Sequence, residues 1–310
     1  MFADLCHFGL PDWLGNFQNP DFPRYFAKYA DAFARRYPWI RLYTPVNEMQ
    51  VTAEYSALRG YWNEKLCSDR AFVTGPTHLV DANIRASLAI RRLCNPWFVQ
   101  SEATRYYHPY DPGAAGLADD LNERRFLSFD LNYGRAPSRR MTGYLLENGM
   151  SRAQIKHFME RDLSSSCIMG TDYYESSEAV VFAGGTTHGS NVLGYHGLTR
   201  QYHERYCLPI MLTETNQVEG LDASAWLQRQ WANVLRLRHE GCSIVGFTWY
   251  SLTDQVDWDI ELRAQHGHVT ENGLYDMARR IRRTGAEYAR IVRAWRPVLS
   301  DTNLLQPAPG

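Results

Sequence analysis

The sequence predicts an α/β protein, an incomplete (β/α)8 barrel of the TIM type with about six of eight parallel strands. Six short apolar runs lack polar–apolar alternation, as expected of strands that are covered on both faces. At least one helical pattern separates each pair of runs, which favours a parallel sheet with crossover helices. The runs end in polar or aromatic residues, and a (β/α)8 barrel carries its active site at that end of its strands.

The expected strands and helices alternate along the chain. The strands are residues 2–7, 42–47, 97–101, 168–173, 210–214 and 244–250, and the helices are 19–37, 77–93, 222–240 and 286–295. Asn19 as N-cap and Pro20 at the first helical position mark the start of the first helix. Segments 111–138 and 175–197 are interpreted as long loops. A doubly wound sheet would need a Gly-rich phosphate turn after its first strand, and residues 7–11 (HFGLP) do not form one.

Length and composition fit one catalytic domain over residues 1–310, with a tail at 297–310 that we expect to fray. The 33 Lys and Arg nearly balance the 34 Asp and Glu, so neither a nucleic acid nor a membrane surface is an expected partner. No apolar run reaches the roughly 18 residues of a membrane span, and the N-terminus lacks a signal-peptide pattern. Six sparse cysteines without a C-x-x-C pair suggest reduced thiols, with Cys6, Cys167 and Cys242 in the core, and hence a cytoplasmic protein.

Two glutamates, Glu48 and Glu214, stand at the ends of apolar strands. An acidic side chain is rarely buried without a partner, so two of them at one edge of a barrel require an explanation. Paired carboxylates across a barrel mouth are the arrangement that glycoside hydrolysis uses. The alternative is a structural role in salt bridges at the strand ends.

Four motifs occur in an order that resembles glycoside hydrolase family 1, the β-glucosidase type of retaining enzyme. They are HFGLPDWL with FQNP (7–14, 17–20), NE (47–48), TETN (213–216), and SLTDQVDW with GL (251–258, 273–274). The resemblance spans residues 1 to about 290 and implies a two-glutamate double displacement that needs no cofactor. It assigns Glu48 as the acid/base and Glu214 as the nucleophile. It further implies that the following residues contact the sugar or the nucleophile: His7, Asn47, Tyr174 and Trp258.

Departures from the family pattern concern the sugar pocket. Asp257 stands where the family has Glu. The Asp side chain is one methylene shorter, so the resemblance leaves the sugar specificity open. Tyr250 stands where the family carries a platform Trp, although the adjacent Trp249 takes that place if the register shifts by one residue. Glu102 has no counterpart and is interpreted as a hydrogen-bonded structural acid. The His266-Gly267-His268 pattern is interpreted as a solvated loop, so no metal site is expected.

By the same resemblance, the first two strand–helix units of the family are missing, along with a sugar-binding Gln and an Arg beside the nucleophile. An open barrel leaves two strand edges unpaired. We therefore expect a homo-oligomer, at least a dimer, acting on a small-molecule β-glycoside or oligosaccharide. Two alternatives remain: a weakly active or inactive sugar-binding barrel, and a subunit that a partner chain completes.

Overall fold

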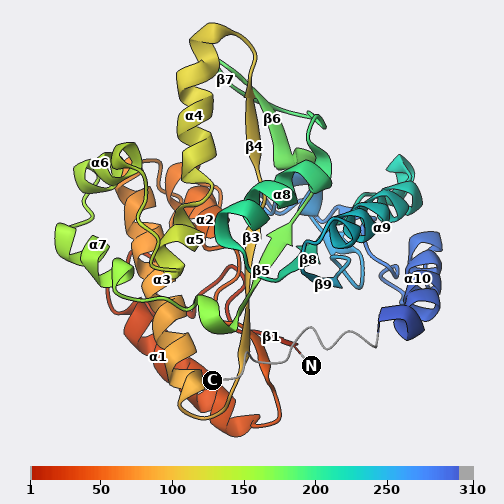
Figure 1. Cartoon of the computed structure of the whole chain (residues 1–310), viewed down its shortest axis with the longest axis horizontal. Coiled ribbons are helices and arrows are strands. Elements are labelled where there is room, and N and C mark those ends of the chain that lie inside the picture. Colours follow the sequence, from red (N-terminus) through yellow and green to blue (C-terminus); the bar gives the residue numbers. More distant parts are fainter. Residues whose placement is uncertain (1, 300–310) are drawn as a thin grey trace. The chain divides into compact units, whose positions relative to one another are not determined.

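A computed structural model describes residues 2–299 and contains one large parallel sheet (Figure 1). The strand order is β1-β2-β3-β5-β8-β9, so the six strands follow one another in chain order, as in a partial (β/α)8 barrel. The strands are β1 (Phe2–Asp4), β2 (Leu42–Thr44), β3 (Trp97–Ala103), β5 (Cys167–Asp172), β8 (Ile210–Glu214) and β9 (Ile244–Phe247). The predicted fold class and all six predicted strands are confirmed.

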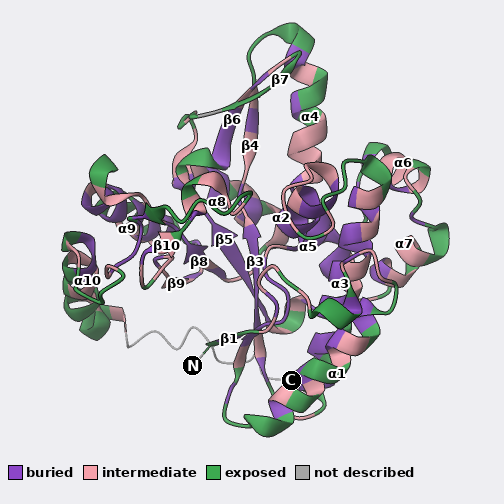
Figure 2. Ribbon diagram, turned by 180° about the vertical axis from the view of Figure 1, so that it is seen from behind, coloured by how far each residue is buried: buried purple, intermediate pink, exposed green. Residues whose placement is uncertain are grey.

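Three of the strands are shorter than the sequence suggests. The parallel ladder between β1 and β2 pairs Phe2 with Leu42 and ends at Asp4 opposite Thr44. The polar residues that follow, His7 and Asn47 among them, lie in the loops beyond this ladder. The buried strand residues include Cys167, and Figure 2 shows the large sheet as mainly buried. Cys6, Cys167 and Cys242 are free thiols and buried, as predicted.

The chain divides into two compact units. The first unit extends to Gly170 and includes Ala179–Thr187, and the second comprises Thr171–Glu178 and the chain from His188 onward. The prediction of a single domain therefore stays a prediction, and each unit is described by itself.

The main helices of the first unit are α1 (Phe22–Arg36) and α3 (Asp69–Arg91). The predicted start of α1 is three residues too early, because Asn19 does not cap the helix. Its Oδ1 accepts the backbone N–H of Asp21 at 2.9 Å, which forms a turn before the helix. α3 begins before the predicted residue 77, because Ser68 caps its first turn and Pro76 is accommodated inside the helix.

The segments predicted as long loops contain regular structure, so that prediction is wrong. Residues 111–138 hold α4 (Ala115–Arg124) and α5 (Leu127–Asn132), which α6 (Arg139–Glu147) and α7 (Arg152–Met159) follow. Residues 175–197 hold β6 (Glu178–Phe182) and β7 (Gly185–His188), which join β4 (Tyr106–Pro109) in a three-stranded sheet beside α4 (Figure 1). Ala114, Ala118 and Val181 help to form a small apolar core between this sheet and α4.

The second unit contains three long helices and a small hairpin. The helices are α8 (Gly194–Tyr206), α9 (Ala223–His239) and α10 (Arg283–Leu299), and the hairpin pairs β10 (Gln255–Val256) with β11 (Val269–Thr270). α10 is longer than predicted, and the rest of the tail expected to fray, residues 300–310, lies outside the described residues. None of the helices within residues 2–299 combines the length and apolar character needed to cross a bilayer.

The ends of the sheet lead to a prediction about assembly. In the described strand order, β1 and β9 each have a neighbour on one side. A strand edge without a neighbour can pair with another chain, so we predict a homo-oligomer whose contact includes these ends of the sheet. Light scattering at micromolar concentration should report at least twice the mass of one chain. A mass equal to one chain at every concentration tested contradicts this prediction.

Candidate active site

Glu48 is the N-cap residue of the short helix α2 (Met49–Ala53), four residues after the end of β2, and is only partly buried. Its backbone has φ 39° and ψ 58°, a left-handed conformation that is uncommon for a residue with a side chain. The backbone N–H of Glu48 donates to the Ser101 carbonyl at 3.1 Å, and its own carbonyl accepts from Thr52 at 2.8 Å. The chain thus turns sharply from strand to helix at Glu48, and residues held in such conformations cluster at functional sites.

A buried amide network holds the segment before Glu48. The Val46 N–H donates to Asn83 Oδ1 at 3.3 Å, and the Val46 carbonyl accepts from Gln100 Nε2 at 3.3 Å. Asn83 Nδ2 in turn donates to Gln100 Oε1 and to Asn132 Oδ1, at 2.7 and 2.8 Å. Both backbone groups of Val46 are therefore fixed from α3 and β3, which restrains the position of the glutamate two residues later.

Glu102 caps helix α2, in agreement with the predicted structural role. Its carboxylate accepts the N–H groups of Gln50 and Val51 at 2.8 and 3.4 Å and the Ser128 hydroxyl at 2.7 Å. These are donors of the first turn of a helix, whose own N-cap residue, Glu48, forms no side-chain cap. Burial, opposed by these hydrogen bonds, raises the pKa of Glu102 to about 7.

His7 and Asn47 follow β1 and β2 and are brought together by the backbone. The Asn47 N–H donates to the Cys6 carbonyl at 2.9 Å, so the loops after the two strands continue side by side. The His7 Nδ1 atom lies 2.7 Å from Asp4 Oδ2, which fixes the orientation of the imidazole. The first unit thus gathers His7, Asn47 and Glu48 at the carboxyl ends of neighbouring strands.

Glu214 is the last residue of β8, and its side chain is 7% exposed. The Tyr174 hydroxyl donates to Glu214 Oε2 at 2.6 Å, the length of a hydrogen bond to a charged acceptor. The Tyr173 N–H donates to the Glu214 carbonyl at 2.9 Å. The loop after β5 therefore orients both the backbone and the carboxylate of Glu214.

Three aromatic residues that follow β9 differ in their surroundings. Trp249 is 4% exposed, and its Nε1 donates to the Asn272 carbonyl at 2.9 Å, so this indole belongs to the core. Tyr250 and Trp258 are only partly buried, with ring centroids 5.7 Å apart. The Tyr250 hydroxyl accepts from Gln255 at 3.0 Å. Of the two residues considered for the platform position, Tyr250 has the more open ring.

The Asp257 carboxylate accepts hydrogen bonds from the other end of the loop in which it stands. Its Oδ2 accepts the N–H groups of His266 and Gly267 at 2.9 and 3.0 Å, and its Oδ1 accepts that of His268 at 2.8 Å. These backbone donors, Gly267 foremost, lower the pKa of Asp257. The carboxylate is thus held in its charged form beside Trp258, and much of its acceptor capacity is used within the loop.

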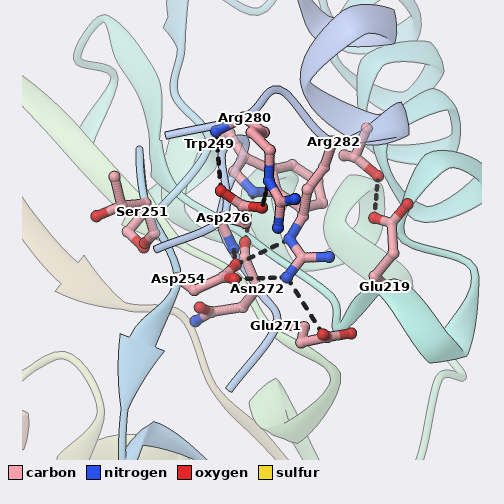
Figure 3. A network of polar contacts seen from close by, with 12 residues as sticks. Glu219, Trp249, Ser251, Asp254, Glu271, Asn272, Asp276, Arg280 and Arg282 are labelled. Atoms are coloured by element: carbon pink, nitrogen blue, oxygen red, sulfur yellow. Dashed lines mark hydrogen bonds and ion pairs between the residues drawn. The ribbon is translucent and has the colours of Figure 1, made fainter. Parts of the chain in front are cut away.

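A buried ion pair that sequence reasoning missed supports the loop after β9 (Figure 3). Asp254 accepts from Arg282 Nε at 3.1 Å and Nη2 at 2.5 Å, and from the Gly273 N–H at 3.0 Å. Asn272 links this region to the loop by donating to Gln255 Oε1 at 2.7 Å. The sequence offers no signal for the pair, because 28 residues separate its two members.

Neither the protein-family models nor the curated proteins contain a match to the chain. Solved structures of similar fold do exist. A β-glucosidase from Thermotoga maritima in complex with glucoimidazole has a TM-score of 0.80 at 14% identity, covering 94% of this chain and 73% of that chain. The family 1 β-glucosidase from Thermotoga maritima has a TM-score of 0.79 at 14% identity, with the same coverage. The azafagomine complex of the Thermotoga maritima enzyme has a TM-score of 0.79 at 15% identity. At this identity the similarity establishes the fold.

Glu102 generates a prediction about stability. Its pKa is raised from 4.5 to about 7, so between these pH values the folded chain binds a proton that the unfolded chain releases. The contribution of this group to the free energy of unfolding is full below pH 4.5 and falls as the pH rises to about 7, by about 3 kcal/mol in total. Urea unfolding of the wild type and of Glu102→Gln from pH 4.5 to 8 should show this decline only in the wild type. Parallel pH profiles contradict it.

Proposed function

We propose that the chain is a retaining β-glycosidase of the β-glucosidase type, with Glu48 as the acid/base and Glu214 as the nucleophile. The observation that carries the proposal is the place of the two glutamates. Glu214 ends β8, and Glu48 follows the carboxyl end of β2 by four residues. Both strands belong to one parallel sheet, and barrel enzymes hold their catalytic groups at this end of their strands. The similarity of fold to β-glucosidases supports the same proposal.

In the proposed mechanism Glu214 attacks the anomeric carbon while Glu48 protonates the departing glycosidic oxygen. Glu48 then takes a proton from water, and this water releases the sugar from Glu214. This double displacement requires the two carboxyl groups to stand about 5 to 5.5 Å apart in the working enzyme. The Tyr174 hydroxyl orients the carboxylate for the attack and stabilises the charge that Glu214 regains as the sugar is released. Neither step calls for a cofactor.

The remaining proposed sugar contacts combine polar and aromatic groups. His7 and Asn47 would hydrogen-bond sugar hydroxyls, and the rings of Tyr250 and Trp258 would pack against the apolar face of the sugar. Trp249, which precedes Tyr250, is buried and donates to the Asn272 carbonyl. Asp257 would add a further hydrogen-bond acceptor beside Trp258. Its oxygens already accept backbone hydrogen bonds within the loop, and its side chain is one methylene shorter than Glu. The proposed substrate class is a small β-glycoside or oligosaccharide.

Two variants test the separate roles of the glutamates on aryl β-glycosides. Glu214→Gln removes the nucleophile and should abolish turnover of every aryl glycoside. Glu48→Gln removes general acid catalysis, which contributes roughly 10²- to 10⁴-fold. This loss should be largest for poor leaving groups and smallest for dinitrophenolate, which departs without a proton. The measurement is kcat/KM for aryl release, which reports the first step alone, against leaving-group pKa.

Glu160 is exposed, so the Glu160→Gln variant is the control and should release aryl groups at the wild-type rate. Equal losses of Glu48→Gln on good and poor leaving groups would contradict its role as acid. Binding of β-glycosides without any turnover by the wild type would favour the sugar-binding alternative.

Tyr174→Phe tests the hydrogen bond to the nucleophile. A hydrogen bond to a charged group contributes about 1.5–3 kcal/mol, so kcat should fall about tenfold to a hundredfold. Tyr144→Phe is a matched control, because the Tyr144 hydroxyl donates to Asp69 over the same 2.6 Å, far along the chain from either glutamate. An unchanged kcat for Tyr174→Phe, or an equal loss for Tyr144→Phe, overturns this role.

A further inference from the structure

A pocket lies wholly within the first unit, among residues of α2, β3, β4, α4 and β7 and of the π-helical turn Glu54–Leu58. Its volume is about 300 Å³, at the lower end of the range of small-molecule sites. None of the residues proposed to act in glycoside hydrolysis lines it. The composition of its wall therefore requires a separate explanation.

The pocket wall is strongly basic. It carries four guanidinium groups, on Arg59, Arg105, Arg124 and Arg125, and one carboxylate, on Glu54, a formal excess of three positive charges. Two further carboxylates lie close to these arginines, Asp69 at 4.0 Å from Arg124 Nη2 and Glu102 near Arg105. Counting both as fully charged still leaves one positive charge in excess.

Glu54 shares its single charge between two arginines. Its Oε1 lies 2.5 Å from Arg59 Nη2, and its Oε2 accepts from Arg105 Nη1 at 2.8 Å. The carboxylate is buried, and the two cations lower its pKa, so it is charged. A buried triad of one anion and two cations keeps a positive charge that a bound anion would balance.

The other two arginines contact backbone carbonyls, aromatic rings and, for Arg124, the Asp69 carboxylate. Arg125 donates through Nε and Nη1 to the carbonyls of Asn122 and Arg105, at 3.1 and 2.7 Å, and lies 4.3 Å from the centre of the Phe126 ring. Arg124 lies over Phe72 at 5.3 Å, and its buried Nε has no hydrogen-bond partner. These guanidinium groups are positioned before any ligand arrives, which lowers the entropy cost of binding.

Gln50, like Arg124, has a buried polar side-chain atom without a hydrogen-bond partner. Its side chain lines the pocket, is 6% exposed, and leaves its buried Oε1 without a hydrogen-bond partner. A buried polar atom without a partner costs about 1–3 kcal/mol.

Besides Tyr107 and Thr186, the rest of the wall includes several aliphatic side chains. Val51, Leu58, Leu117 and Leu121 line the same cavity as the arginines. Arginine recognises carboxylates and phosphates through paired N–H groups, whereas an aliphatic wall suits an apolar body. We propose that this pocket binds a small organic anion, a carboxylate or phosphate monoester on an apolar body about one ring in size.

Calorimetric titration of the full chain tests the proposal with three probes of similar size: benzoate, phenyl phosphate and neutral benzyl alcohol. At least one anion should bind saturably at one site, at least tenfold more tightly than benzyl alcohol, and its affinity should fall with added salt. The two anions distinguish carboxylate from phosphate recognition. Absence of binding by both, or equal binding of benzyl alcohol, overturns the proposal.

Two variants locate the site. Arg124→Gln removes one cation, and the nearly isosteric Gln50→Glu places a carboxylate among the arginines, so each should weaken anion binding at least tenfold. Thermal unfolding verifies folding, and Gln50→Glu should keep or raise the melting temperature because it supplies the missing negative charge. Arg85→Gln, on the exposed face of α3, is the control and should bind like the wild type. Unchanged binding by both variants overturns the proposal, and the readout does not depend on glycosidase activity.

Discussion

The candidate site depends on backbone hydrogen bonds that join the ends of neighbouring parallel strands. In a parallel sheet, such bonds fix the register in which each strand passes into its loop, and so decide which side chains meet at the carboxyl edge. Four of them involve the residues at or next to the site: Asn47 N to Cys6 O at 2.9 Å, Glu48 N to Ser101 O at 3.1 Å, Tyr173 N to Glu214 O at 2.9 Å and Tyr250 N to Thr215 O at 3.0 Å. A shift of register at any of them would move a proposed catalytic or binding group.

Buried polar groups stabilise these strand ends in both units, by different means. In the first unit, the amides of Asn83 and Gln100 hold Val46, and the Glu102 carboxylate caps the helix that follows Glu48. In the second unit, the ion pair of Asp254 and Arg282 supports the loop that carries Tyr250 and Trp258. Removing one member of a buried pair leaves an uncompensated group, so such networks tie the position of the site to the stability of the fold.

The strands and both glutamates could be predicted from the sequence, because continuous apolar runs that end in polar residues have one simple explanation. The small sheet of β4, β6 and β7 was missed because the Gly184-Gly185 pair was interpreted as part of a loop. The apolar run that follows Glu178, residues 179–182, stands before these glycines and is a hairpin signal that could have revealed it. The pairing of Asp254 with Arg282 and the closure of the Asp257 loop depend on tertiary packing, which no local pattern encodes.

The central claim is the proposal that Glu214 forms a covalent bond to the sugar and that Glu48 acts as the acid/base. The most direct test is incubation of the wild type with a 2-deoxy-2-fluoro-β-glycoside that carries a good leaving group, followed by mass spectrometry of the intact chain and of its peptides. The account predicts one added fluoro-sugar per chain, attached to Glu214, and no labelling of the Glu214→Gln variant. A label on another residue, or steady hydrolysis of natural substrates without any label, would contradict it.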